Sequence, residues 1–117
     1  MIPLLASLPP PIVVLDARQQ PRALQDRMKG VEAFVNTGKS TIYLNSQSAA
    51  FQHALRGPGI WDYALAITIW HEMAHLAGAD EREAQRREEA LWLEFVVAGK
   101  IDSRQGMSYL QLMRKRR

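Results

Sequence analysis

The chain has 117 residues, which is enough for one folded domain, so residues 1–117 are expected to form a single domain. Apolar residues make up 47% and charged residues 23%, and this ordinary globular composition excludes a disordered or fibrous chain. The absence of cysteine excludes a disulfide framework, a cysteine-based zinc finger and a thiol nucleophile. The formal net charge of +3 owes much to the last four residues, which are expected to form a solvated basic tail.

The sequence also indicates which partners and which location to expect. No basic face with interleaved aromatic residues is evident, so no nucleic-acid partner is expected. The longest apolar stretch, residues 60–79, includes Asp62, His71 and Glu72, which make it too polar for a membrane span. Residues 1–15 are apolar but proline-rich and lack a basic start, so they predict an extended segment leading into a strand. The lack of a clear signal peptide favours the cytoplasm.

The first half of the chain predicts a small sheet. Residues 12–15 are β-prone and predict a short strand, and residues 22–29 predict a short helix that ends at Gly30. Residues 31–36 and 40–45 flank a glycine-containing turn, as expected for a β-hairpin. These segments predict a small N-terminal sheet, antiparallel or mixed.

The second half predicts helices, each introduced by a side chain able to cap its first turn. They cover residues 49–56 after Ser46 or Ser48, residues 63–77 after Asp62, a stretch from Asp80 to about residue 98, and a short final helix after Ser108. A sheet followed by helices is an α+β arrangement.

The helix over residues 63–77 is apolar on almost every side, which is typical of a buried helix. Its polar members are Thr68, His71, Glu72 and His75. Titratable groups in a buried helix are costly unless they are paired or bind a metal, so this segment needs a polar partner.

Three of these residues have a spacing that suits metal chemistry. His71, Glu72 and His75 read H-E-x-x-H, and residues four apart lie on one face of a helix. Two imidazoles there can converge on one ion, and Zn²⁺ suits neutral histidine nitrogens. Glu72 is rotated by about 100° around the helix, where it can approach water at the metal without being a ligand. A carboxylate in that position can accept and later return a proton.

A catalytic zinc needs a third protein ligand. His53 is available, but nothing in the pattern singles it out. Glu81 is preferred, because Gly78 allows a sharp turn and Gln85, one helical turn after Glu81, could hydrogen-bond a ligating histidine. Glu88 is the rival ligand if the two helices form a close antiparallel pair.

Residues 71–75 resemble the zincin signature of zinc metallopeptidases. The segment E-x-x-A-Q from Glu81 to Gln85 resembles the glutamate helix of the gluzincins, in which the Glu is the third ligand and an Asp four residues on supports a ligating histidine. Gln85 replaces that Asp. The spacing through Gly78 also resembles the metzincin motif, with Glu81 in place of a histidine and Met107 as the only loose candidate for its Met-turn. The short chain is most similar to minigluzincins.

This resemblance implies an endopeptidase-like zinc metallopeptidase acting on peptide or protein substrates. Zinc would be held by His71, His75 and Glu81, with Glu72 as general base and then general acid toward a zinc-bound water. Residues 40–45 would form an edge strand that binds extended substrate. Because so short a chain leaves little wall for a cleft, the alternative is a zinc-binding but latent or inactive zincin-like protein, blocked by its own terminus or acting through a partner. A metal-free helical adaptor is the third interpretation.

Overall fold

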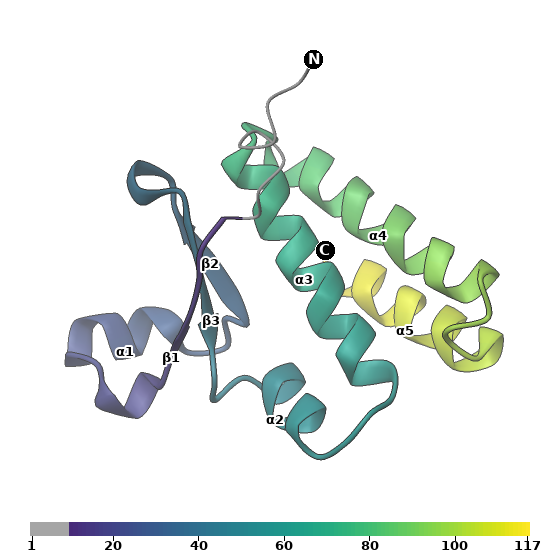
Figure 1. Cartoon of the computed structure of the whole chain (residues 1–117), viewed down its shortest axis with the longest axis horizontal. Coiled ribbons are helices and arrows are strands. Elements are labelled where there is room, and N and C mark those ends of the chain that lie inside the picture. The colour runs from purple at the N-terminus through teal and green to yellow at the C-terminus, as the bar shows by residue number, and fades with distance from the viewer. Residues whose placement is uncertain (1–9) are drawn as a thin grey trace.

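The computed structural model describes residues 10–117, with the side chain of Thr37 excepted. It is an α+β fold in which a small mixed sheet is followed by packed helices, as the sequence predicts (Figure 1). The strands are β1 (Ile12–Leu15), β2 (Ala33–Asn36) and β3 (Thr41–Asn45). The helices are α1 (Arg22–Met28), α2 (Ala49–Leu55), α3 (Ile60–Leu76), α4 (Glu81–Val97) and α5 (Ser103–Lys115). The extended segment expected before β1 falls mostly on residues 1–9, outside the described residues.

The sheet has the order β1-β3-β2. The predicted hairpin is present, since β2 pairs antiparallel with β3 across the short helical turn Thr37–Lys39. The expectation that residues 40–45 form an edge strand is wrong, because β1 pairs parallel with the other side of β3 from Ile42 to Asn45. Four of the five β3 residues are buried, as befits a central strand. Within residues 10–117, the edges of this sheet are β1 and β2.

Two helices begin earlier than the sequence predicts. α3 begins at Ile60, and Asp62 lies inside its first turn, where its carboxylate accepts a hydrogen bond from the Gly59 backbone at 3.3 Å. α5 begins at Ser103, because Asp102 caps it by accepting from the Gln105 backbone at 3.0 Å. Of the four basic residues expected to form a solvated tail, Arg114 and Lys115 belong to the last turn of α5, and Arg116 and Arg117 follow it. This places the end of α5 beside α3 and α4.

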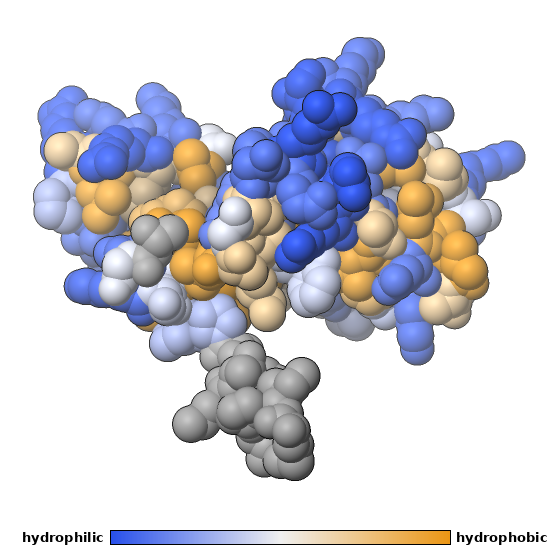
Figure 2. All heavy atoms as spheres, turned by 90° about the horizontal axis from the view of Figure 1, so that it is seen from above, coloured by the Kyte–Doolittle hydropathy of each residue, from blue (hydrophilic) through white to orange (hydrophobic). Residues whose placement is uncertain are grey.

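The main core lies between α3, α4 and α5, while α1 lies on the far side of the sheet (Figure 1). Its buried members are Ala64, Ile67, Trp92, Ile101, Leu110 and Met113. Trp92 is fully buried, and its indole N–H donates to the Gly106 carbonyl at 2.8 Å, which fastens α5 to α4. None of the described helices is both long and apolar enough for a membrane crossing. Hydrophilic side chains dominate the surface in Figure 2, with separate apolar patches between them.

Gly106 allows this close approach of two helices. A Cβ added there would lie 2.6 Å from Val96 Cγ2 and 3.2 Å from Ile101 Cγ2. We expect Gly106→Ala to destabilise the protein, although alanine favours a helix over glycine by about 1 kcal/mol. Overpacking a core costs about 1–3 kcal/mol. Thermal unfolding beside the exposed control Gln111→Ala measures the effect, and a rise in melting temperature for Gly106→Ala would contradict this packing.

Candidate metal centre

Three side chains from two helices converge at the end of α3. His71 and His75 lie one turn apart on α3, and their Nε2 atoms are 3.2 Å apart. Glu81, the first residue of α4, places its Oε1 2.7 Å from His71 Nε2 and 2.9 Å from His75 Nε2. Single donor atoms of the three residues all lie within 4.8 Å of one another, so the group could hold a metal ion. The structure thus brings together the residues that the sequence proposes as ligands.

The turn after α3 makes this convergence possible. Gly78 adopts φ +98°, a left-handed conformation that side chains rarely tolerate. The Gly78 N–H donates to the His75 carbonyl at 3.0 Å and the Ala79 N–H to the Ala74 carbonyl at 2.9 Å, which is the Schellman pattern of a helix end. Asp80 then caps α4 by accepting from the Glu83 backbone at 2.8 Å. The chain reverses at once, and Glu81 returns toward the histidines.

The other ring nitrogen of each histidine has an oxygen partner. His71 Nδ1 lies 2.8 Å from Glu88 Oε1, and His75 Nδ1 lies 3.0 Å from the Ala79 carbonyl oxygen. A histidine that donates from Nδ1–H to these oxygens keeps Nε2 as the nitrogen that can bind a metal, which is the tautomer that a ligand needs. An Nε2 that carries a proton instead donates it to Glu81. Glu88, the rival ligand, therefore contacts the ring nitrogen that points away from the other two donors.

The hydrogen bond expected from Gln85 is made by Glu88 instead. α3 and α4 pack side by side along their length, so a residue two turns into α4 lies opposite His71 (Figure 1). The sequence carries a signal for this, because Glu81 and Glu88 are seven residues apart on one face of a helix. That spacing indicates that Glu88 shares the face but does not say which histidine nitrogen it contacts.

The charges of the group suit a cation. Burial lowers the pKa of His71, but its hydrogen bond with Glu88 and the charges of Glu88 and Glu81 raise that pKa further, to above its usual value. Burial raises the pKa of Glu81, but its interactions with His75 and His71 outweigh this and lower it. The site therefore favours positive charge among these donors. Two imidazole nitrogens and one carboxylate oxygen are also donor types that bind divalent metal ions.

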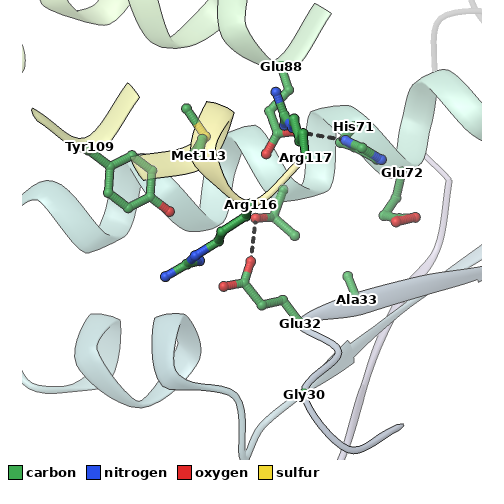
Figure 3. Close-up of a pocket in the computed structure, with 11 residues that line it drawn as sticks. Gly30, Glu32, Ala33, His71, Glu72, Glu88, Tyr109, Met113, Arg116 and Arg117 are labelled. Atoms are coloured by element: carbon green, nitrogen blue, oxygen red, sulfur yellow. Dashed lines mark hydrogen bonds and ion pairs between the residues drawn. The ribbon is translucent and has the colours of Figure 1, made fainter. Parts of the chain in front are cut away.

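Glu72 faces a cavity beside this group. The cavity has a volume of about 290 Å³, and its walls come from β2, α3, α4 and the end of α5 (Figure 3). Glu72 is only 9% exposed, and burial raises the pKa of its carboxyl, although His71 and His75 oppose the shift. Within residues 10–117 its carboxylate makes no hydrogen bond, and its oxygens are open to solvent, because no fully buried side-chain oxygen there lacks a partner. Glu88, with the same exposed fraction, contacts His71. Glu72 thus offers a carboxylate free to interact with a molecule in the cavity.

Two other residues considered from the sequence lie apart from the group. His53, on α2, stacks on Trp61 with ring centroids 4.5 Å apart. Met107 lies inside α5 and is 42% exposed, so it forms no turn beneath the histidines. Neither residue takes part in the candidate centre.

Comparison of the chain with models of known protein families, with curated proteins and with solved structures found no match. The candidate centre is therefore defined by its own geometry.

The donor geometry makes a direct prediction about metal binding. We expect His75→Ala and Glu81→Ala to lose stoichiometric Zn²⁺ binding, because each removes an atom that faces the other two donors. Glu88→Ala should retain binding but weaken it by about 10–100-fold, as expected for a residue that orients a ligand. Titration calorimetry of purified, metal-stripped protein measures the affinities.

Glu94→Ala is the matched control, because Glu94 is an exposed carboxylate on the same helix. It should leave the affinity unchanged. Loss of binding in Glu88→Ala together with full binding in Glu81→Ala would show that Glu88, and not Glu81, is the third ligand.

Proposed function

We propose that the protein is a zinc-dependent metallopeptidase of the zincin type, closest in style to the gluzincins. The observation that carries this proposal is Glu72: a largely buried residue whose carboxylate makes no hydrogen bond within the described chain and is open to a cavity, next to the His71, His75 and Glu81 donors. Structural zinc is normally enclosed by four protein ligands, whereas this group offers three donors beside a cavity, as a catalytic site does.

Zinc, when bound, would supply a Lewis acid that polarises the scissile carbonyl and makes water more acidic. The residues of the chain supply the rest of the reaction. The Glu72 carboxylate accepts a proton from the water whose oxygen attacks the carbonyl carbon. It then delivers that proton to the amide nitrogen as the C–N bond breaks. Glu88 and the Ala79 carbonyl hold the two imidazoles in the orientation required for metal binding.

The substrate in this proposal is an extended peptide. β2, rather than the central strand β3, is the sheet edge next to the cavity, and Ala33 of β2 lines it (Figure 3). Strand addition to β2 would pair the backbone of the peptide with that edge and bring its carbonyl groups past Glu72. This replaces residues 40–45 by residues 33–36 as the substrate-aligning strand.

A zinc-binding but latent protein is the second candidate, and one observation favours it. Arg116 and Arg117, at the end of α5, line the same cavity as His71 and Glu72 (Figure 3). Side chains of the protein itself thus occupy part of the space that a substrate needs. In this case the protein holds zinc but hydrolyses peptides only when the end of α5 is displaced.

The general-base role predicts the behaviour of Glu72→Gln. We expect this variant to bind zinc as the parent does. It should hydrolyse peptides about 10²–10⁴-fold more slowly, because the amide cannot accept the proton of water. Cleavage of a mixed peptide library, followed by mass spectrometry with zinc content measured in parallel, tests this. Glu94→Gln, the same change on an exposed side chain, is the control and should cleave normally.

Equal cleavage by Glu72→Gln and the parent, with zinc bound to both, would show that the proposed mechanism is wrong. Activity of the parent should also disappear with a chelator and return on addition of zinc.

The latent alternative makes a separate prediction. If the end of α5 blocks the cavity, Arg116→Ala should open it, and hydrolysis should appear or rise with zinc content unchanged. The library assay applied to the parent and to Arg116→Ala decides this. Full activity in the parent, with no gain in Arg116→Ala, rejects latency through this residue.

A further inference from the structure

A row of charged side chains leads from the end of α5 to the candidate metal centre. The Arg117 guanidinium contacts two adjacent carboxylates of α4, those of Glu88 and Glu89. Glu89 also accepts a hydrogen bond from Arg114 Nε at 2.9 Å, which fixes the far side of the row. The Glu88 oxygen that contacts Arg117 is Oε1, the same atom that lies 2.8 Å from His71 Nδ1 (Figure 3).

This arrangement restrains Glu88. The Arg117 and Glu88 side chains are 20% and 12% exposed, so water screens their interaction less than it screens an exposed pair. Glu88 has a flexible side chain, and holding its carboxylate in one position costs conformational entropy. A charge-assisted contact with a planar guanidinium offsets that cost and selects one position. The selected position is the one that meets His71.

We propose that Arg117 is a positioning residue of the metal centre, which strengthens divalent-metal binding by holding Glu88 against His71. The proposal rests on the metal centre of the proposed function but does not depend on peptidase activity. Arg117 contacts Glu88, Glu88 contacts His71 Nδ1, and the Nε2 of the same ring faces Glu81.

Simple electrostatics predicts the opposite effect. A cationic side chain near a metal site repels the incoming ion, so its removal should tighten binding. Arg116 provides the matched comparison, because it lines the same cavity and carries the same charge but forms no ion pair within residues 10–117. If Arg117 acts by positioning Glu88, Arg117→Ala should weaken metal binding. If only its positive charge matters, Arg117→Ala should tighten metal binding.

The experiment measures Zn²⁺ affinity by competition with a chromogenic chelator. We expect Arg117→Ala to bind zinc about 10-fold more weakly than the parent, in the range found for residues that orient metal ligands. Arg116→Ala should bind as the parent does or more tightly. Arg117→Lys keeps the charge but lacks the planar fork, so its affinity should be intermediate. Circular dichroism and melting temperature first establish that each variant is folded.

Glu88→Gln tests whether the effect passes through Glu88. The amide oxygen can still accept from His71, but it no longer attracts Arg117 as a carboxylate does. In a Glu88→Gln background, Arg117→Ala should therefore cause no further loss of affinity. A mere destabilisation of α5 would instead weaken binding in both backgrounds equally.

Three results would overturn the proposal. These are unchanged or tighter binding in Arg117→Ala, equal weakening in Arg116→Ala, and additive losses in the double variant. If the parent binds no zinc, the metal centre fails together with this role of Arg117. If the parent binds zinc and only the Arg117 results disagree, the metal centre stands and the positioning role alone is wrong.

Discussion

The reversal of the chain between α3 and α4 is the constraint on which the candidate centre depends. A histidine pair on a helix is easily formed, but a third donor must come back to it within a few residues. Gly78 permits this because its backbone is left-handed, and the Ala79 carbonyl exposed by the same turn contacts His75. One local conformation therefore delivers Glu81 to the histidines and also orients one of them.

Two glutamates of equal burial have different environments around this turn. Glu72 and Glu88 are both 9% exposed, and both line the cavity. Glu88 is held between Arg117 and His71, whereas the Glu72 carboxylate has no such partner in the described chain. Burial alone does not determine what a carboxylate can do, because its contacts decide whether it is held in one position or available to another molecule. This difference is the physical basis for giving the two residues separate roles.

The features that sequence could predict are those with local causes. The spacing of His71 and His75 and the glycine at position 78 act within one helix and one turn, so their convergence with Glu81 follows from helix geometry. The strand and helix order also follows from local patterns. The contact of Glu88 with His71 depends on how closely two helices pack, and the sequence carries only the shared face of Glu81 and Glu88.

The features that the sequence does not predict are mainly those that distant segments decide. The hairpin pattern of residues 31–45 is local, but whether β3 is an edge depends on β1, which pairs with it from about thirty residues away in the chain. The basic residues after position 113 read as a tail, because no local pattern shows that Arg117 meets acidic residues of α4. The start of α5 is the exception, because the cap that makes this helix longer than expected, Asp102, is a local signal.

The attachment of α5 at Gly106 has a geometric consequence. Because Trp92 and Gly106 fix that point on α4, the remainder of α5 acts as a rigid spacer that sets where its final side chains lie. A residue inserted between Gly106 and the end of α5 would advance the helix by about 1.5 Å and rotate everything beyond it by about 100°. The length of this segment therefore cannot change without changing its helical phase, and natural variation there should be confined to substitutions rather than insertions.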